Sequence, residues 1–576
     1  MIRFYMLGLL FVWMTAIQAQ WSTDANVNNL VGGIAGDDVI PQVATTTDGH
    51  TYISWFSLEG GNYNVRMQLF DVNGNALWQP GGLLVSSHPS MTWLTDYSLT
   101  VDKEHCAIIG FQDIRDGNNN IYAYRISQQG QFVWGPDGLA LSDNTAFEPY
   151  PVMAVPDDNQ TVFAWQSEDS TGQGIIRLQK VAADSTRLWG QWGIEYKSSL
   201  AGENFIYPAL VPSDNQSVIL VFHKQTGSWM NPKQIWAQKF DAAGNPVWAS
   251  DVPVFNGSGV PIIPRFLVEP DGAGGVVVCW HDTRAGMGIF NVFVQRINSS
   301  GNVLFTTDGV AVGPTTNSIQ MNPGMAFNPV NQTITTFFNV ENTGQSQWGL
   351  AGQMFDAGGQ ALWSAAMNVV IPMGSVEISN IEVRRAYNQA LVTYQYYDFV
   401  NSSDARIQGM LTDGFGNTVW MPAITTICNV QSGKVHGVTG YYHDQQWILA
   451  WEDGRNGNPD VYAQNVLISG QLGPAPSGQD ESLPGTDRIS LAIAPNPFSD
   501  ALTIRLSGIE PGKLRVTVTD LPGKQVRELF QGELRQGTLD LQWDGCNGEG
   551  ARLAPGVYLL QVLSASGRES ARVILR

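Results

Sequence analysis

Three positions along the chain combine an aspartate with an arginine two residues later. They are Asp113 with Arg115, Asp282 with Arg284, and Asp453 with Arg455. A guanidinium group can bind a carboxylate through two parallel hydrogen bonds, and this would hold the loop that carries the pair. Because the pair recurs, whereas a catalytic site is expected to be unique, we interpret it first as a structural ion pair.

The last of these loops also has the composition of a calcium site. Asp453, Asn456, Asn458 and Asp460 offer side-chain oxygen atoms within a short stretch, and Ca²⁺ prefers oxygen ligands. The stretch lacks the ligand spacing and the closing glutamate of an EF-hand loop. Three interpretations therefore stand, in this order: a structural ion pair, a calcium site and a ligand contact.

Other catalytic motifs do not occur in the sequence. The 7 histidines show no HExxH spacing, and the 4 cysteines form no CxxC pair. There is no GxSxG, no P-loop and no GxGxxG between a strand and a helix. We expect no cofactor. A pair of carboxylates of the kind that glycosidases use cannot be located on so acidic a chain.

An aromatic residue just after a glycine turn recurs about every 57 residues. These anchor residues are Trp78, Trp134, Trp189, Trp248, Phe305, Trp363 and Trp420. Most units open near a proline, namely Pro41, Pro151, Pro208, Pro264 or Pro323. An apolar strand such as 276–280 follows, then an alternating strand such as 292–297, a tight turn, and a strand that carries the aromatic anchor. Four short strands per repeat are typical of a β-propeller blade.

The two ends of the repeat region complement each other. Seven units contain their own anchor, but an eighth, from about residue 437 to 473, stops before one. Residues 20–24 resemble residues 133–137, so Trp21 would supply the missing anchor. The sequence therefore predicts an all-β protein with an eight-bladed β-propeller closed by its N-terminal strand. A seven-bladed ring is the alternative, because the unit at 381–420 is the least regular.

Composition and the N-terminus indicate export. Residues 1–19 have one charge, Arg3, an apolar run to about Ile17 and small residues at Ala16 and Ala19, which predicts a cleaved signal peptide. We expect no transmembrane segment in the mature chain. The formal net charge of −20 argues against nucleic acid as a partner. The predicted propeller spans 20–473, and a linker rich in proline and glycine spans 474–488.

Residues 489–576 alternate like the strands of a small Ig-like β-sandwich. Pro495, Asn496, Pro497 and Phe498 open this module, Gly556 and Tyr558 precede its penultimate strand, and Arg572 lies in the basic, apolar ending. In these motifs the module resembles the C-terminal sorting domain of the type IX secretion system of Bacteroidota. Residues 543–558 also resemble the Ig-like fold of flagellar hook-capping proteins. Arg572 departs from the lysine common at its position, and Cys546 interrupts the Trp543-Asp544-Gly545 turn.

The resemblance to sorting domains implies passage through the periplasm and the outer membrane. It also implies two partners, the type IX translocon and a sortase-like peptidase that removes the module. An adhesive Ig-like module that stays on the product is the alternative. For the propeller we expect a cell-surface or secreted protein that binds a glycan or a protein and is not an enzyme. The alternative is a secreted hydrolase of polysaccharide or peptide, which should show convergent carboxylates, or a metal, at one end of the propeller channel.

Overall fold

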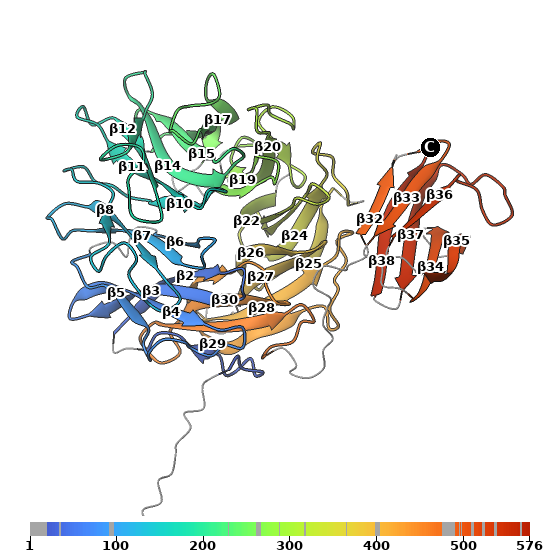
Figure 1. Cartoon of the computed structure of the whole chain (residues 1–576), viewed down its shortest axis with the longest axis horizontal. Helices are drawn as coiled ribbons and strands as arrows, with labels where there is room; N and C mark the ends of the chain where they lie inside the picture. The colour runs from blue at the N-terminus through green and yellow to red at the C-terminus, as the bar shows by residue number, and fades with distance from the viewer. Residues whose placement is uncertain are drawn as a thin grey trace, which may run out of the picture. The chain divides into compact units, whose positions relative to one another are not determined.

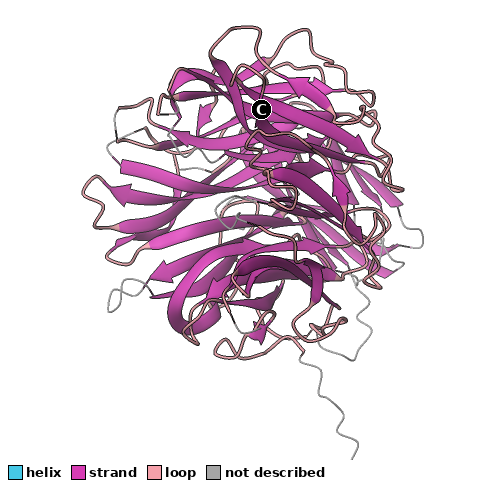
Figure 2. Cartoon of the chain, turned by 90° about the vertical axis from the view of Figure 1, so that its left-hand side faces the viewer, coloured by secondary structure: helices cyan, strands magenta, loops and turns pink. Residues whose placement is uncertain are grey.

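A computed structural model places the chain in an all-β arrangement, and the residues that it describes form no helix (Figure 2). Described are residues 20–576 except 34–35, 91–96, 229, 261–265, 287, 316–317, 364–365, 398–403, 475–489, 495, 497, 508–511, 521–524, 535–537 and 565–566. They fall into two compact units, one ending at Ala475 and one starting at Pro476. The predicted signal peptide, nearly all of the predicted linker, and Pro264, Pro495 and Pro497 lie outside the described residues.

The first unit contains six four-stranded antiparallel sheets, each built from strands consecutive in the chain. The first three are β2 (Asp38–Thr45), β3 (Thr51–Glu59), β4 (Asn62–Phe70) and β5 (Leu83–Ser86); β6 (Ser98–Val101), β7 (Ala107–Asp113), β8 (Asn120–Ile126) and β9 (Leu139–Ala140); and β10 (Val152–Ala154), β11 (Thr161–Glu168), β12 (Gly174–Val181) and β13 (Ile194–Tyr196). The next three are β14 (Glu203–Pro212), β15 (Val218–Thr226), β16 (Lys233–Phe240) and β17 (Val252–Val260); β18 (Phe266–Pro270), β19 (Val276–Asp282), β20 (Asn291–Ile297) and β21 (Val310–Ala311); and β22 (Ser318–Asn328), β23 (Thr333–Asn342), β24 (Trp348–Phe355) and β25 (Asn368–Gly374).

A seven-stranded sheet completes this unit, in the order β1, β31, β30, β29, β28, β27, β26. Its strands are β1 (Asn29–Leu30), β26 (Ile378–Ala386), β27 (Gln389–Tyr397), β28 (Asp404–Thr412), β29 (Thr425–Thr439), β30 (Gln446–Asp453) and β31 (Asp460–Leu467). The long strand β29 pairs with β28 through residues 425–433 and with β30 through residues 434–439. At the far edge, Asn29 and Leu30 pair with Ala463 and Tyr462 of β31.

The sheets of this unit follow one another like propeller blades (Figure 1). The first strands β2, β6, β10, β14, β18, β22, β26 and β29 contact one another in that order, and β2 also contacts β29 and β30. Apolar side chains of the second and third strands fill the layers between neighbouring sheets. Trp55, Trp165, Trp280 and Trp451 are fully buried there. Burying one large side chain contributes about 1.5–3 kcal/mol, so these layers are the main source of stability.

Three first strands, β2, β14 and β22, contain a bulge at the repeated proline, and a fourth proline, Pro151, lies just before β10. Ile40, Tyr150, Tyr207 and Asn322 have φ between 50° and 59°, and each precedes a proline. In β26 and β29 the equivalent left-handed residues are Asn380 and His436, which precede Ile381 and Gly437. The bulge inserts a residue and turns the strand locally. In three units the proline of the sequence repeat therefore belongs to a bulge on the first strand, and two units depart from it.

The aromatic anchors do not lie in strands, which corrects the prediction of an aromatic-bearing fourth strand. Each follows a single bridge such as Phe70↔Ala76, and the fourth strand begins a few residues later. The indole of Trp78 donates to the carbonyl of Gln128 (2.9 Å) and that of Trp189 to Ala242 (3.0 Å), in the tight turn of the next sheet. The side chains of the other anchors are each only 7% exposed, namely those of Trp134, Trp248, Phe305, Trp363 and Trp420.

Trp21 stands in the same relation to the first sheet. Its backbone N–H donates to Asn73 O (2.8 Å), and its ring lies 5.5 Å from that of Phe70. Gly74, in the tight turn, has φ +89°, and a Cβ there would lie 2.6 Å from the Trp21 ring. Glycine is thus required at this turn both by its backbone and by the anchor that packs on it.

The second unit is a sandwich of two sheets. One is ordered β32 (Ser490–Ala494), β33 (Leu502–Ser507), β36 (Thr538–Trp543), and the other β35 (Gln525–Leu534), β34 (Gly512–Asp520), β37 (Gly556–Ser564), β38 (Gly567–Leu575). Alternate residues of β33, β34, β37 and β38 form a core around Trp543. The alternating runs 502–506, 514–519, 539–543, 557–562 and 572–576 in the sequence predict five of these strands, and no such run predicts β32 or β35.

Candidate functional site

The three Asp/Arg pairs have the geometry of structural ion pairs. Arg115 Nε lies 2.8 Å from Asp113 Oδ2, and Arg284 Nη2 lies 2.6 Å from Asp282 Oδ2. The guanidinium carbon of Arg284 lies 3.6 Å from the ring centroid of Phe293 on the next strand. Arg115 and Arg284 also donate to the carbonyls of Asp137 (2.7 Å) and Asp308 (2.8 Å). Each arginine thus ties a hairpin loop to a later loop of its own sheet.

The third pair is part of a larger buried network. Arg455 Nη2 lies 2.5 Å from Asp453 Oδ2, and Lys434 Nζ lies 3.3 Å from the same carboxylate. Arg455 also donates to Asn28 Oδ1 (3.0 Å) in the N-terminal segment. Burial alone would raise the pKa of Asp453, but the hydrogen bond from Arg455 and the charge of Lys434 lower it to about 2. At Asp113, where no lysine adds its charge, burial prevails and raises the pKa.

The calcium candidates are not arranged as a metal site. The Asp453 carboxylate accepts hydrogen bonds from Ser432, Trp451 and Arg455. Asn456 turns its amide nitrogen towards Asp460 Oδ2 (3.2 Å) and the Tyr462 hydroxyl (2.8 Å), while Asn458 is exposed. In the described part of the chain, no cluster of three or more His, Cys, Asp or Glu side chains could hold a metal ion.

The described residues of the sorting motif converge on the last strand, β38. Asn496 Nδ2 donates to Arg572 O, and Ile574 N donates to Asn496 Oδ1, both at 2.9 Å. Phe498 forms a parallel bridge with Leu575 and packs 5.3 Å from Trp543. Tyr558 packs on the same indole, 5.6 Å away, and Gly556 pairs with Leu575, while the side chain of Arg572 is exposed. These residues hold the chain terminus against the sandwich.

A group of charged side chains on the first strands was not foreseen from the sequence. Arg384 Nη2 lies 2.6 Å from Glu382 Oε2 on β26, and Arg384 Nε donates to Thr439 O (2.7 Å) on β29. The guanidinium carbon of Arg384 lies 5.6 Å from the ring centroid of Tyr441, a side chain that is 67% exposed. On β18, Glu269 accepts a hydrogen bond from Phe327 N (2.6 Å).

Glu269 is electrostatically coupled to the β26 residues. Desolvation raises its pKa to about 7, against the opposing influence of the Phe327 N–H and the charges of Arg384 and Arg385. A carboxyl group that titrates near neutral pH, beside an arginine, is typical of functional sites. Charged residues in otherwise apolar first strands were the available sequence signal. The sequence did not reveal that separate sheets bring them together.

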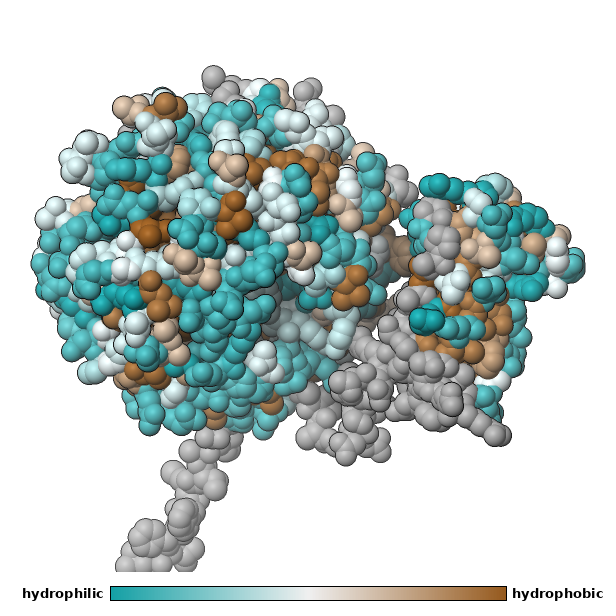
Figure 3. Space-filling view, turned by 45° about the horizontal axis from the view of Figure 1, so that its top comes forward, coloured by the Kyte–Doolittle hydropathy of each residue, from teal (hydrophilic) through white to brown (hydrophobic). Residues whose placement is uncertain are grey.

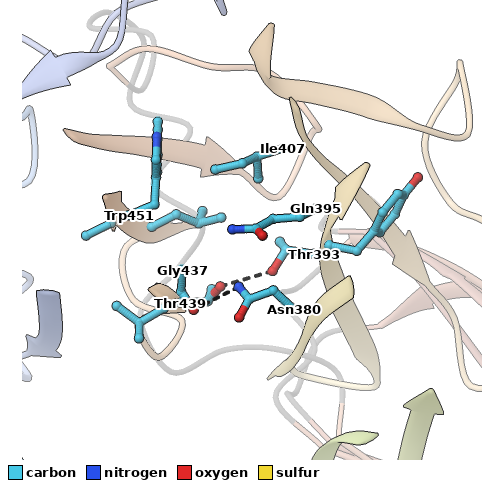
Figure 4. Close-up of a pocket in the computed structure, with 11 residues that line it drawn as sticks. Asn380, Thr393, Gln395, Ile407, Gly437, Thr439 and Trp451 are labelled. Atoms are coloured by element: carbon cyan, nitrogen blue, oxygen red, sulfur yellow. Dashed lines mark hydrogen bonds between the residues drawn. The ribbon is translucent and has the colours of Figure 1, made fainter. Parts of the chain in front are cut away.

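A small pocket adjoins this group, between β26, β27 and β29 (Figure 4). Its open space is about 230 Å³ with the solvent at its mouth included, and the pocket has room for about one water molecule. Asn380, Gln395, Gly437 and Trp451 line it, and so do Thr393 and Thr439, whose hydroxyl oxygens lie 3.0 Å apart. Asn380 Nδ2 donates to Gly437 O (2.9 Å).

On the face of the first unit that Figure 3 shows, hydrophobic side chains lie in separate small groups among hydrophilic ones. Several exposed aliphatic residues directly precede an anchor, among them Leu77, Val133 and Leu188. Within the described residues there is no helix of the length and apolarity that a membrane span requires.

Comparison with known proteins finds no match among curated sequences. Among solved structures, the polysaccharide lyase Uly1 is 11% identical, with 77% of this chain and 92% of the lyase covered and a TM-score of 0.40. The Dos1 propeller is 12% identical, with 77% and 95% covered and a TM-score of 0.42. PorZ of Porphyromonas gingivalis, a surface component of the type IX secretion system, is 13% identical, with 93% and 81% covered and a TM-score of 0.22. These TM-scores are too low to support a functional assignment. One family profile, the FlgD Ig-like domain, matches residues 499–568, so the second unit contains an Ig-like domain of this type.

Proposed function

We propose that the mature chain is an exported cell-surface or secreted protein that binds a glycan through an eight-bladed β-propeller. Six four-stranded sheets and one seven-stranded sheet, in which β29 serves two blades, support eight blades. The circuit of contacts between first strands and the pairing of β1 with β31 support a ring closed by the N-terminal segment.

The ligand site proposed is the group Glu269, Glu382, Arg384 and Tyr441. The observation that carries it is the exposed Tyr441 ring beside Arg384, which is itself paired with Glu382. An exposed aromatic ring offers a flat face to the C–H groups of a sugar. The carboxylates beside it can accept hydrogen bonds from sugar hydroxyls. A protein ligand is the other outcome that the experiment below distinguishes.

A combined array of glycans and extracellular proteins tests this site on the chain without residues 1–19. Replacing Tyr441 by Ala should weaken glycan binding about tenfold or more, as loss of a central aromatic contact does. Phe147→Ala is the matched control, because Phe147 is also exposed, at 51%, but lies outside the group. Equal losses in the two variants, or binding to proteins alone, would reject the proposed glycan site.

A second candidate is hydrolysis of a polysaccharide, and the pKa of Glu269 favours it. A carboxyl group protonated near pH 7 can donate a proton to a leaving oxygen, and a second carboxylate, Glu382, is ion-paired with Arg384. Glu269→Gln should then abolish turnover of any glycan bound on the array and leave its binding intact. Bound glycans that are not cleaved by the unmodified chain assign the site to binding.

For the C-terminal module, residues 489–576, we propose the role of a type IX sorting signal. Support comes from the motif residues that hold β38 and from the Ig-like match. Its partners would be the type IX translocon and a sortase-like peptidase. In a host with this system, removal of β38 should leave the protein in the periplasm. Intact-mass measurement should show surface material ending near residues 473–490. Full-length surface chains, with export unaffected by removing β38, would favour an adhesive module instead.

A further inference from the structure

The pocket between β26, β27 and β29 lies where a contact that three other sheets make to the next sheet is missing. In the second strand of each sheet, one residue follows the aromatic side chain of the interior. In three sheets this residue contacts the next sheet, either on its first strand or on the segment just before that strand. Gln112 Nε2 donates to Glu148 O, Tyr207 N donates to Gln166 Oε1 (3.3 Å), and Ile40 N donates to Glu452 Oε1 (2.6 Å). We call this contact the inter-sheet latch.

At the equivalent position of β27, Gln395 does not make the latch. Its Oε1 accepts a hydrogen bond from the Tyr397 hydroxyl (3.0 Å), a residue of the same strand. Among the described residues, Gln395 Nε2 has no hydrogen-bond acceptor, although the side chain is only 3% exposed. Figure 4 shows this nitrogen pointing into the pocket between Gly437 and Trp451. A buried donor without an acceptor is unfavourable, so this position suits an oxygen atom from outside the chain.

Gly437 provides the space for that atom. It stands where Pro41, Pro151, Pro208 and Pro323 follow the left-handed residue in other units. A Cβ at Gly437 would lie 2.5 Å from Asn380 Nδ2 and 3.5 Å from Gln395 Nε2. A proline or any larger residue here would therefore occupy the pocket. Two departures from the repeat, at Gln395 and at Gly437, thus meet at one place.

The chemistry of the lining selects an uncharged group. No charged side chain lines the pocket among the described residues. The lining offers the Gln395 amide N–H, the Asn380 amide and the hydroxyls of Thr393 and Thr439. A carboxylate, sulfate or ammonium group would lose its hydration here without a counter-charge, which is unfavourable. A hydroxyl group can both donate and accept, and so matches amides and hydroxyls together.

We propose that this pocket receives one hydroxyl group of a neutral sugar and makes the propeller select uncharged over acidic glycans. This inference rests on the proposed glycan-binding function. Arg384 links the two places, since it lies beside Tyr441 and donates to the carbonyl of Thr439, a residue of the pocket wall. A sugar stacked on Tyr441 would lie near a pocket that takes one of its hydroxyls.

Crystals of the chain without residues 1–19, soaked with methyl glucoside, methyl galactoside, methyl mannoside or glucuronic acid, test the pocket directly. We expect a sugar hydroxyl within hydrogen-bond distance of Gln395 Nε2 for at least one neutral glycoside and not for the acid. Density for water alone in all soaks, or for the acid, overturns the proposal. This readout does not depend on the array, so binding at Tyr441 with an empty pocket rejects only the pocket.

Variants give the same test in solution. Gln395→Leu keeps the approximate size but removes the donor, and Gly437→Ala narrows the pocket; each should weaken binding of a neutral glycoside about fivefold or more. Gln431→Leu is the matched control, because Gln431 is an exposed glutamine on β29. Circular dichroism and thermal unfolding identify a variant that fails to fold. Unchanged affinity in both folded variants contradicts the assignment.

Discussion

The sheet β6–β9 and the sheet region formed by β29–β31 with β1 carry the same Asp/Arg signature in different settings. In the first, Arg115 joins two loops of one continuous sheet. In the second, Arg455 reaches Asn28, which precedes β1, and the buried Lys434 joins the same carboxylate. The edge strand there has only two residues. The comparison teaches that one motif can serve a local loop in one sheet and the joining of distant chain segments in another.

The largest expected effect comes from deleting the N-terminal segment, which pairs with β31 of the last sheet. Deleting residues 20–29 removes Trp21, which is 2% exposed, and half of β1. A tryptophan buries about 200 Å², so the loss is about 5 kcal/mol at 25 cal/mol per Å². Thermal unfolding should shift strongly downward. Val27→Ser, at a side chain that is 60% exposed, is the control and should leave it unchanged. An unchanged transition in the deletion would show that the N-terminal segment does not complete the sheet.

The next effect separates the two ion pairs. Asp453→Ala leaves both Arg455 and the fully buried Lys434 without their carboxylate, and breaking such a pair costs about 3–5 kcal/mol. Asp113→Ala leaves only Arg115 without its carboxylate, so the loss of stability should be smaller. Denaturant unfolding of both variants measures the difference. A sequence-based estimate for an exposed loop would be nearer 1 kcal/mol, so equal small losses would mean that the network adds nothing.

The pH dependence of stability should differ in sign between the two aspartates. The pKa of Asp453 is lowered in the folded state, so its contribution is present above pH 4 and is lost as pH falls through about 2. This contribution is about 2 kcal/mol, since each pKa unit corresponds to about 1.4 kcal/mol. The pKa of Asp113 is raised, so its contribution grows as pH falls. Relative to the unmodified protein, Asp453→Asn should become less harmful on acidification and Asp113→Asn more harmful. Parallel curves would refute this distinction.

The smallest expected effect concerns the loop that follows Asp453 and Arg455 in the last sheet. Asn458→Ala should change stability by no more than about 0.5 kcal/mol, because the side chain is exposed and the loop is held by Asp453 and Arg455. Addition of calcium or of a chelator should not move the thermal transition. A calcium-dependent shift that disappears in Asn458→Ala would restore the metal interpretation.

Much of the fold was predictable because strands and turns depend on local pattern. The spacing of the anchors placed the repeat, and the likeness of residues 20–24 to 133–137 located the N-terminal partner of the last sheet. The strand assignment of the anchors was wrong, because a bridge followed by a loop has the same alternation as a strand. The pocket depends on which side chains meet across β26, β27 and β29. The sequence around Gln395 does not reveal how these strands are aligned with one another.

Strand β1 also fixes the order in which the first unit can be completed. Gln464 Nε2 donates to Ser22 O (2.7 Å) across 442 residues of intervening chain. The segment synthesised first therefore finds its place only after almost the whole unit has been made. Contacts so distant in sequence form late and slowly. Until then the edge of β31 stays unpaired and open to pairing with another chain, so the last step of folding also removes an exposed strand edge.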